Sequence, residues 1–94
     1  MNTLSICIPR IETTIQKDFI ISTINKLRIG MIEKITEIPL RNDINHKRII
    51  MKIRWNNTEN SLIIQNRLQN NQTIKLVYDN TPWYWKIVVA KSHY

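Results

Sequence analysis

Apolar and polar residues alternate over the segment 47–55, KRIIMKIRW, as expected of a strand with one buried face. One side of such a strand carries apolar residues only: Ile49, Met51, Ile53 and Trp55. The other side carries three cations and one isoleucine: Arg48, Ile50, Lys52 and Arg54. We expect this strand to be central in a sheet, with its basic side as the working surface. The alternative is that the cations only keep a half-exposed sheet soluble.

The spacing of apolar residues elsewhere predicts strands over 4–8, 31–40, 73–78 and 83–91, and helices over 14–27 and 59–70. Pro9 is expected to end the first strand, Thr13 to cap the first helix, and Gly30 to stop that helix in a left-handed conformation. The polar segments 41–47 and 79–82 are expected to be a loop and a turn.

The segment 31–40 is open to two interpretations, because Ile32, Ile35 and Ile38 are three residues apart, which suits a helix. It follows directly on a predicted helix stop and contains Pro39, so we expect a strand. A bulge or a shifted start would reconcile the spacing with a sheet.

The order of these elements predicts an α+β fold of the ferredoxin-like split βαβ type, βαββαβ. We expect a single domain, residues 1–94, with a four-stranded antiparallel sheet and two helices on one face. Several families share this plait, so the fold alone does not fix the function.

The net charge of the chain indicates which class of partner it binds. The chain has 94 residues and a formal net charge of +7, and its pI is about 9.9. This excess favours a polyanionic partner: nucleic acid first, an acidic membrane or an acidic protein second. Cys7 is the only cysteine, which excludes an internal disulfide and favours a reducing, intracellular compartment. No apolar run is long enough to cross a bilayer and no signal peptide is expected, so we expect no membrane partner.

Several catalytic and metal chemistries lack the residues they need. His46 and His93 are far apart and lie in no cluster with ligand spacing, and Cys7 has no CxxC partner. With one glycine, neither GxxxxGK[ST] nor GxGxxG is present. Acylphosphatases share the plait but need a glycine-rich loop where this chain has PRI, residues 9–11. We therefore expect no enzyme, no cofactor and no metal site.

Residues 48–55 carry a basic residue first, an aliphatic residue sixth and an aromatic residue eighth: Arg48, Ile53 and Trp55. At these places the segment resembles the third-strand octamer of the RNA recognition motif family, which has basic, Gly, aromatic, small, aromatic, aliphatic, any and aromatic residues. The family's first-strand hexamer is matched by residues 6–11 only at the aliphatic places, and the end of the last predicted strand, VAK, is also similar. The frequent Ile and Asn and the sequence WYWK look similar to short proteins of large DNA viruses, which implies a virion or a virus factory.

The resemblance implies binding of RNA or other single-stranded nucleic acid on the open sheet face. Because the family's stacking aromatics are replaced, by Cys7 and Lys52 among others, affinity would come mainly from phosphate contacts. The predicted phosphate contacts are Arg10, Arg48, Lys52, Arg54, Lys86 and Lys91, with Ile50 on the same surface. Tyr84 would stack on a base, and Trp83 would lie at the rim.

Two alternatives remain. The aromatic residues Trp83, Tyr84 and Trp85 could all be core or hairpin packing. The other alternative for function is a protein-interaction or virion-structural module, in which Ile50, Val88 and Cys7 pair with another protein or with a second copy of the chain in a homodimer.

Overall fold

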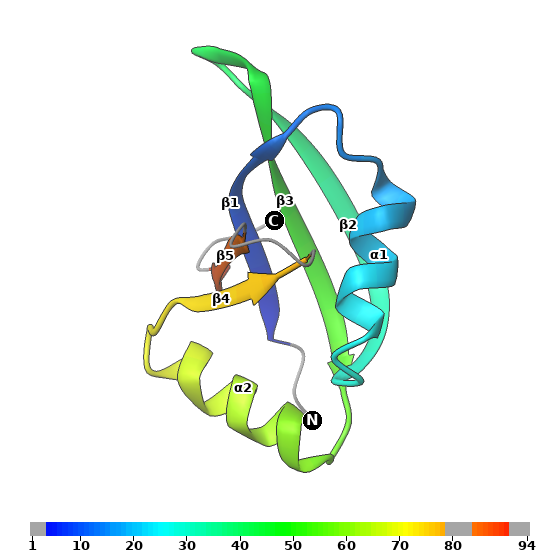
Figure 1. Ribbon diagram of the computed structural model, residues 1–94. Helices are drawn as coiled ribbons and strands as arrows, with labels where there is room; N and C mark the ends of the chain where they lie inside the picture. The colour runs from blue at the N-terminus through cyan, green and yellow to red at the C-terminus, as the bar shows by residue number, and fades with distance from the viewer. Residues whose placement is uncertain (1–3, 79–83, 91–94) are drawn as a thin grey trace.

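The computed structural model describes residues 4–78 and 84–90, and its strands and helices follow in the order that the sequence pattern predicts. They are β1 (Ser5–Glu12), α1 (Lys17–Asn25), β2 (Gly30–Leu40), β3 (Asp43–Trp55), α2 (Glu59–Gln69), β4 (Ile74–Val77) and β5 (Tyr84–Val89) (Figure 1). The predicted turn 79–82, Trp83 and Lys91 lie outside the described residues.

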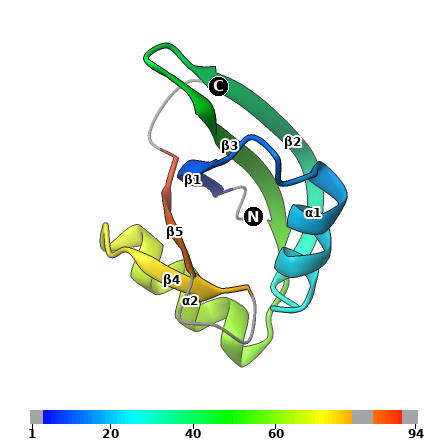
Figure 2. The same cartoon turned by 45° about the horizontal axis from the view of Figure 1, so that its top comes forward.

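The strands form one antiparallel sheet of five strands in the order β2-β3-β1-β5-β4 (Figures 1 and 2). The prediction of a four-stranded plait with two helices on one face is therefore wrong. The short strand β4 pairs along its length with β5 and widens the sheet by one strand, because its alternation matches that of β5. The helices lie apart, α1 beside β2 and α2 against β4 and β5 at the other end of the sheet.

The core lies against one face of this sheet, here called the inner face. It is built from alternate residues of the strands and from three helix residues: Ile6, Ile8, Ile49, Met51, Ile53, Leu76, Trp85 and Ile87, with Ile20, Ile24 and Leu68. The predicted buried side of β3 is confirmed for Ile49, Met51 and Ile53, which are fully buried. Trp55 is only half-buried, and its indole Nε1 donates a hydrogen bond to the backbone oxygen of Leu4 at 2.9 Å.

Two of the register shifts in the sheet explain features of β1 and β2 that the alternation of residues does not predict. β1 does not end at Pro9 as predicted but continues to Glu12. Its register with β3 shifts between Ile8 and Ile11, which leaves Pro9 and Arg10 opposite Arg48 alone. A bulge tolerates proline because one residue there has no ladder partner.

The second shift confirms that the segment 31–40 is a strand with a bulge. The irregularity lies between Ile32 and Lys34. Ile32 therefore pairs with Ile53, and Ile35 pairs with Met51, although the two isoleucines are three residues apart. Both are packed against the core.

The first helix is shorter than predicted, and its ends differ. Its N-cap is Gln16 rather than Thr13, with no side-chain hydrogen bond. The left-handed residue after the helix is Arg28, with φ of 52°. Gly30 instead begins β2 with φ of 152°, where an added Cβ would overlap the backbone oxygen of Arg54.

The predicted loop 41–47 is mostly strand, since β3 begins at Asp43. The polar residues of this extension hold neighbouring segments through side-chain and backbone hydrogen bonds. Lys47 Nζ donates to the backbone oxygen of Ile15 and to Glu37 Oε1, each at 2.7 Å. Thr13 N donates to Asn45 O at 2.9 Å. The prediction of a loop over 41–47 rested on polarity alone and was wrong, because these polar residues bind backbone groups of the segment between β1 and α1.

Candidate nucleic-acid interface

The face opposite the core, here called the outer face, collects the predicted contact residues of β3 and β5. Cys7 pairs with Ile50 on one side and with Val88 on the other, so residues of equal parity on the three strands share this face. It carries the predicted residues that the structure describes: Arg48, Ile50, Lys52 and Arg54 from β3, Tyr84 and Lys86 from β5, and Arg10 from the β1 bulge.

The apolar row in the middle of the outer face is buried, contrary to the expectation of an open apolar surface. Ile50 is 5% exposed and Cys7 is 8% exposed. Ile50 is paired with Cys7 and Thr36 and is flanked along β3 by Arg48 and Lys52, whose long stems can cover apolar neighbours. Arg48 is itself half-buried, and its Nε has no hydrogen-bond partner among the described residues.

Burial also governs the chemistry of the cysteine. Removal from water raises the pKa of the Cys7 thiol, and the positive charge of Arg48 opposes this only in part. The thiol therefore stays protonated at neutral pH and acts as a small apolar group of the sheet.

The cations at the end of β3 share one carboxylate. Arg54 Nη2 lies 2.7 Å from Glu33 Oε2, and Lys52 Nζ lies 4.0 Å from Glu33 Oε1. Both cationic side chains remain more than half exposed, at 64% for Arg54 and 51% for Lys52. Glu33 comes from the bulge in β2, so this partial neutralisation depends on a register shift that the sequence did not locate.

At the other end of β3, Arg10 is held by an acidic partner. Arg10 Nη2 donates to Asp43 Oδ2 at 2.6 Å, and His46 Nδ1 lies 2.8 Å from the same oxygen. The hydrogen bond from His46 is the main reason that the pKa of Asp43 lies below its ordinary value. No group of three His, Cys, Asp or Glu side chains within the described part of the chain could hold a metal ion.

The outer face of β4 and β5 contains a cation that sequence reasoning missed. Lys75 pairs directly with Lys86, and Val77 pairs with Tyr84. Lys75 Nζ lies over the Tyr84 ring, 5.0 Å from its centroid, and Tyr84 is 40% exposed. The alternation of residues 73–78 was the signal for Lys75, because it places this lysine on the side away from the apolar residues.

The alternative that the aromatic residues pack in the core holds for Trp85 but not for Tyr84. The Trp85 ring is buried on the inner face, stacked on Tyr78 with ring centroids 4.6 Å apart and edge-on to Phe19 at 6.0 Å. This cluster joins α1 to the end of β4 and to β5.

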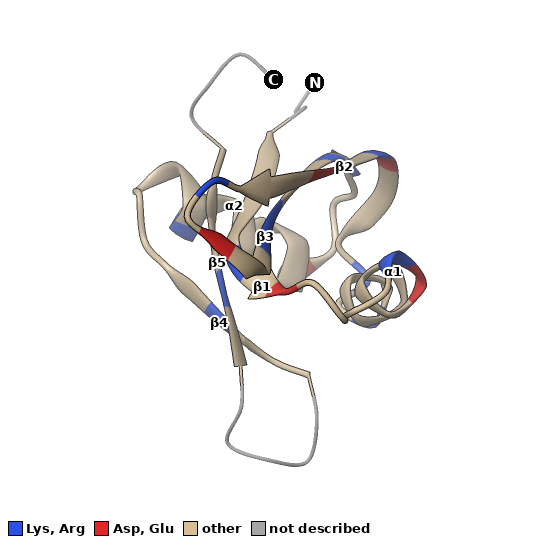
Figure 3. Ribbon diagram, turned by 90° about the horizontal axis from the view of Figure 1, so that it is seen from above, with Lys and Arg blue, Asp and Glu red and all other residues tan. Residues whose placement is uncertain are grey.

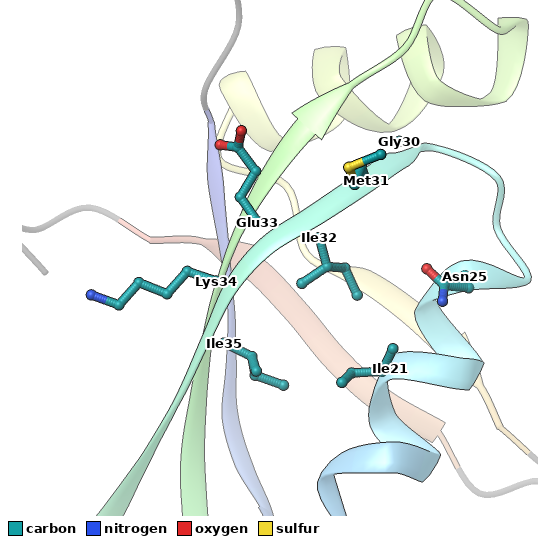
Figure 4. A pocket seen from close by; sticks show the side chains of 8 residues that line it. All are labelled: Ile21, Asn25, Gly30, Met31, Ile32, Glu33, Lys34 and Ile35. Atoms are coloured by element: carbon teal, nitrogen blue, oxygen red, sulfur yellow. The ribbon is translucent and has the colours of Figure 1, made fainter.

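A hollow of about 430 Å³ lies between α1 and β2 (Figure 4). Ile21 of α1 and Ile32 and Ile35 of β2 point toward one another there, while Lys34 points away. The hollow lacks the convergent polar groups that orient a small ligand.

The charged residues of the sheet are drawn in Figure 3, where blue segments mark β3, β4 and β5.

Comparisons with models of protein families, with curated proteins and with solved structures found no match. The resemblance to the RNA recognition motif and the likeness to viral proteins therefore stay predictions. Neither helix in the described part of the chain is long and apolar enough to span a membrane.

Proposed function

We propose that this protein binds RNA, or another single-stranded nucleic acid, on the outer face of its sheet and catalyses no reaction. The observation that carries the proposal is the shared face of β3 and β5: Lys52, Arg54, Tyr84 and Lys86 are exposed on the side opposite the core. Cations next to a half-exposed aromatic ring suit the phosphates and the bases of a single strand.

The ion pairs on this face leave the cations free to bind phosphate. Glu33 holds Arg54 and Lys52 at a position where all three groups meet solvent. Surface pairs of this kind contribute only about 0–1 kcal/mol. Replacing the carboxylate by a phosphate therefore costs little free energy. Binding of the nucleic acid also releases counterions, which favours the complex.

The aromatic residue on this face favours a single strand over a duplex. Tyr84 lies within a strand of the sheet, so its ring can stack only on a base that has left its pair. Phosphate contacts from the surrounding cations position the strand but read no sequence. We infer low sequence specificity for the same reason.

The interaction-module alternative is less well supported, because it needs an apolar surface at Ile50, Val88 and Cys7. Ile50 and Cys7 are almost fully buried within this chain and Val88 is half-buried, so they have little area to offer a partner protein. Of the two cations that flank Ile50, Lys52 is exposed and Arg48 is half-buried, and Arg54 further along β3 is exposed, so this part of the face offers charge rather than apolar area.

The test is a titration of a labelled single-stranded RNA oligonucleotide followed by fluorescence anisotropy at several salt concentrations. Single strands give a slope of about −0.7 in log affinity against log salt for each neutralised phosphate, so four or five contacts predict a slope of about −3. A duplex of the same length should compete poorly. No binding, or an affinity independent of salt, would refute the proposal.

A further inference from the structure

We propose that the outer face of β4 and β5 holds one nucleotide, with its base on Tyr84 and its phosphate between Lys75 and Lys86. This inference rests on the proposed function and names the position where a base is held. Lys75, on the edge strand, becomes a binding residue of the sheet.

The first argument is the direct opposition of two lysines. Lys75 and Lys86 are paired across the β4–β5 ladder, where opposite side chains stand about 4.5–5.5 Å apart at Cβ. Like charges in this arrangement repel each other. Among residues 4–78 and 84–90, no carboxylate forms a salt bridge with either lysine. An anion between them relieves the repulsion, and a phosphate supplies acceptor oxygens for both ammonium groups.

The second argument is the environment of the tyrosine ring. Tyr84 is paired with Val77, so Lys75 is its diagonal neighbour across the ladder. Lys75 Nζ lies over one side of the ring at 5.0 Å, a cation–π contact. This contact orients the ring while the side chain stays 40% exposed. The remaining surface can accept the π-face of a base.

The third argument is a comparison with the other lysine pair of the same face. Lys34 and Lys52 are also directly opposite each other, on β2 and β3. There, Glu33 lies 4.0 Å from Lys52, and no aromatic residue is paired with either strand position. The Lys75–Lys86 pair has an aromatic neighbour and, within the described ranges 4–78 and 84–90, no carboxylate partner, so it is the pair that fits a nucleotide.

The opposing explanation is that Lys75 only protects the edge strand β4 from pairing with other chains, a common use of lysine at sheet edges. In that case Lys75 and Tyr84 contribute to binding no more than any other cation or apolar side chain. The two explanations differ in whether the bases of the ligand matter at Tyr84.

The experiment compares two oligonucleotides of equal length, a single-stranded RNA and an abasic version with the same number of phosphates. Each is titrated against the wild-type protein and four variants: Tyr84→Ala, Tyr84→Phe, Lys75→Ala and the matched control Lys34→Ala. All three substituted positions are exposed, and circular dichroism checks that each variant is folded.

We expect Tyr84→Ala to weaken binding of the RNA about 5- to 150-fold and to leave binding of the abasic strand unchanged, since stacking contributes about 1–3 kcal/mol per base. Tyr84→Phe should bind like the wild type, because the ring is retained. Lys75→Ala should reduce the magnitude of the salt slope by about 0.7, the contribution of one phosphate contact on a single strand, and Lys34→Ala should reduce it less.

Each outcome either supports or overturns the nucleotide site on β4 and β5. Wild-type binding with a steep salt slope, together with an unaffected Tyr84→Ala variant or with equal effects of Lys75→Ala and Lys34→Ala, overturns the nucleotide site and leaves the proposed function standing. If the wild-type protein binds neither oligonucleotide, both proposals fail.

Discussion

Gly30, at the start of β2, lies so close to the backbone oxygen of Arg54 in β3 that no side chain fits between them. Its pairing with Trp55 requires this approach, and its φ of 152° is a conformation that other residues rarely adopt. The close approach of β2 to β3 therefore depends on the only glycine of the chain, which has no side chain to keep the strands apart.

Replacement of this glycine should be severely destabilising. We expect Gly30→Ala to lower the free energy of unfolding by at least about 2 kcal/mol, because the added Cβ strains the backbone and displaces β2 from β3. Urea denaturation measures the change. Ser22→Ala, at an exposed position of α1, is the control and should change little. Equal stability of the two variants would contradict the close contact.

Trp55 should stabilise the fold both by packing and through its indole N–H. Trp55→Phe removes the hydrogen bond to Leu4 O and should cost about 1 kcal/mol. Trp55→Ala also removes the half-buried ring and should cost about 3 kcal/mol. The difference between the two unfolding curves measures the packing contribution. If Trp55→Ala unfolds at the same urea concentration as Trp55→Phe, the ring does not contribute to the core.

Stability should fall in acid partly through Asp43. Its pKa is lowered in the folded state, mainly by the hydrogen bond from His46, so its contribution is present above the unfolded pKa of 3.8 and is lost as pH falls through the folded value. Asp43→Asn should therefore be less stable than the parent at pH 6, and the difference should shrink in acid. A difference that stays constant down to strongly acidic pH would contradict this assignment.

Cys7 should be slow to react with thiol reagents in the native protein. Burial raises its pKa, so the reactive thiolate is scarce and shielded. Because the unfolded chain ionises first as the pH rises, this group also lowers stability above its ordinary pKa of 9.0. The reaction rate should rise greatly in denaturant. Similar rates in the native and the unfolded protein would show that the thiol is accessible.

Glu33 should oppose nucleic-acid binding, since it competes with phosphate for Arg54 and Lys52. We expect Glu33→Gln to increase affinity for single-stranded RNA severalfold. Glu59→Gln raises the net charge equally at an exposed position of α2 and is the matched control. Equal effects of the two variants would mean that net charge, rather than the Glu33 contacts, governs affinity.

The long alternation of β3 was sufficient to predict which side is buried, because Ile49, Met51 and Ile53 pack on a continuous core. The same reasoning placed Tyr84 and Lys86 away from the core. The bulge at Pro9 was not predicted, and the bulge considered for residues 31–40 could not be located at Glu33, since the position of a register shift depends on the partner strand. The pairing of β4 with β5, and therefore the position of Lys75, likewise depends on contacts between distant segments.

Because Ile50 is buried, it is not a suitable position for an experiment that distinguishes nucleic-acid binding from the protein-interaction module. A glutamate at this position would be enclosed by the chain itself, so Ile50→Glu is expected to unfold the protein rather than to report on a partner. Val77 is 58% exposed on the same face and is the better probe. Val77→Glu should leave the fold intact, and sedimentation of this variant would reveal any association through this surface.

The seam between β1 and β5 is narrow. Within the described residues, register pairs join Ile6 to Val89 and Cys7 to Val88, and Ala90 N adds one bond to Ser5 O. Amide hydrogens exchange with solvent through local opening, so β4 and β5 should lose protection together and sooner than β2 and β3. A nucleic acid held at Tyr84 would slow exchange in these two strands first, and deuterium labelling would therefore record binding as rigidity gained far from the long β2–β3 ladder.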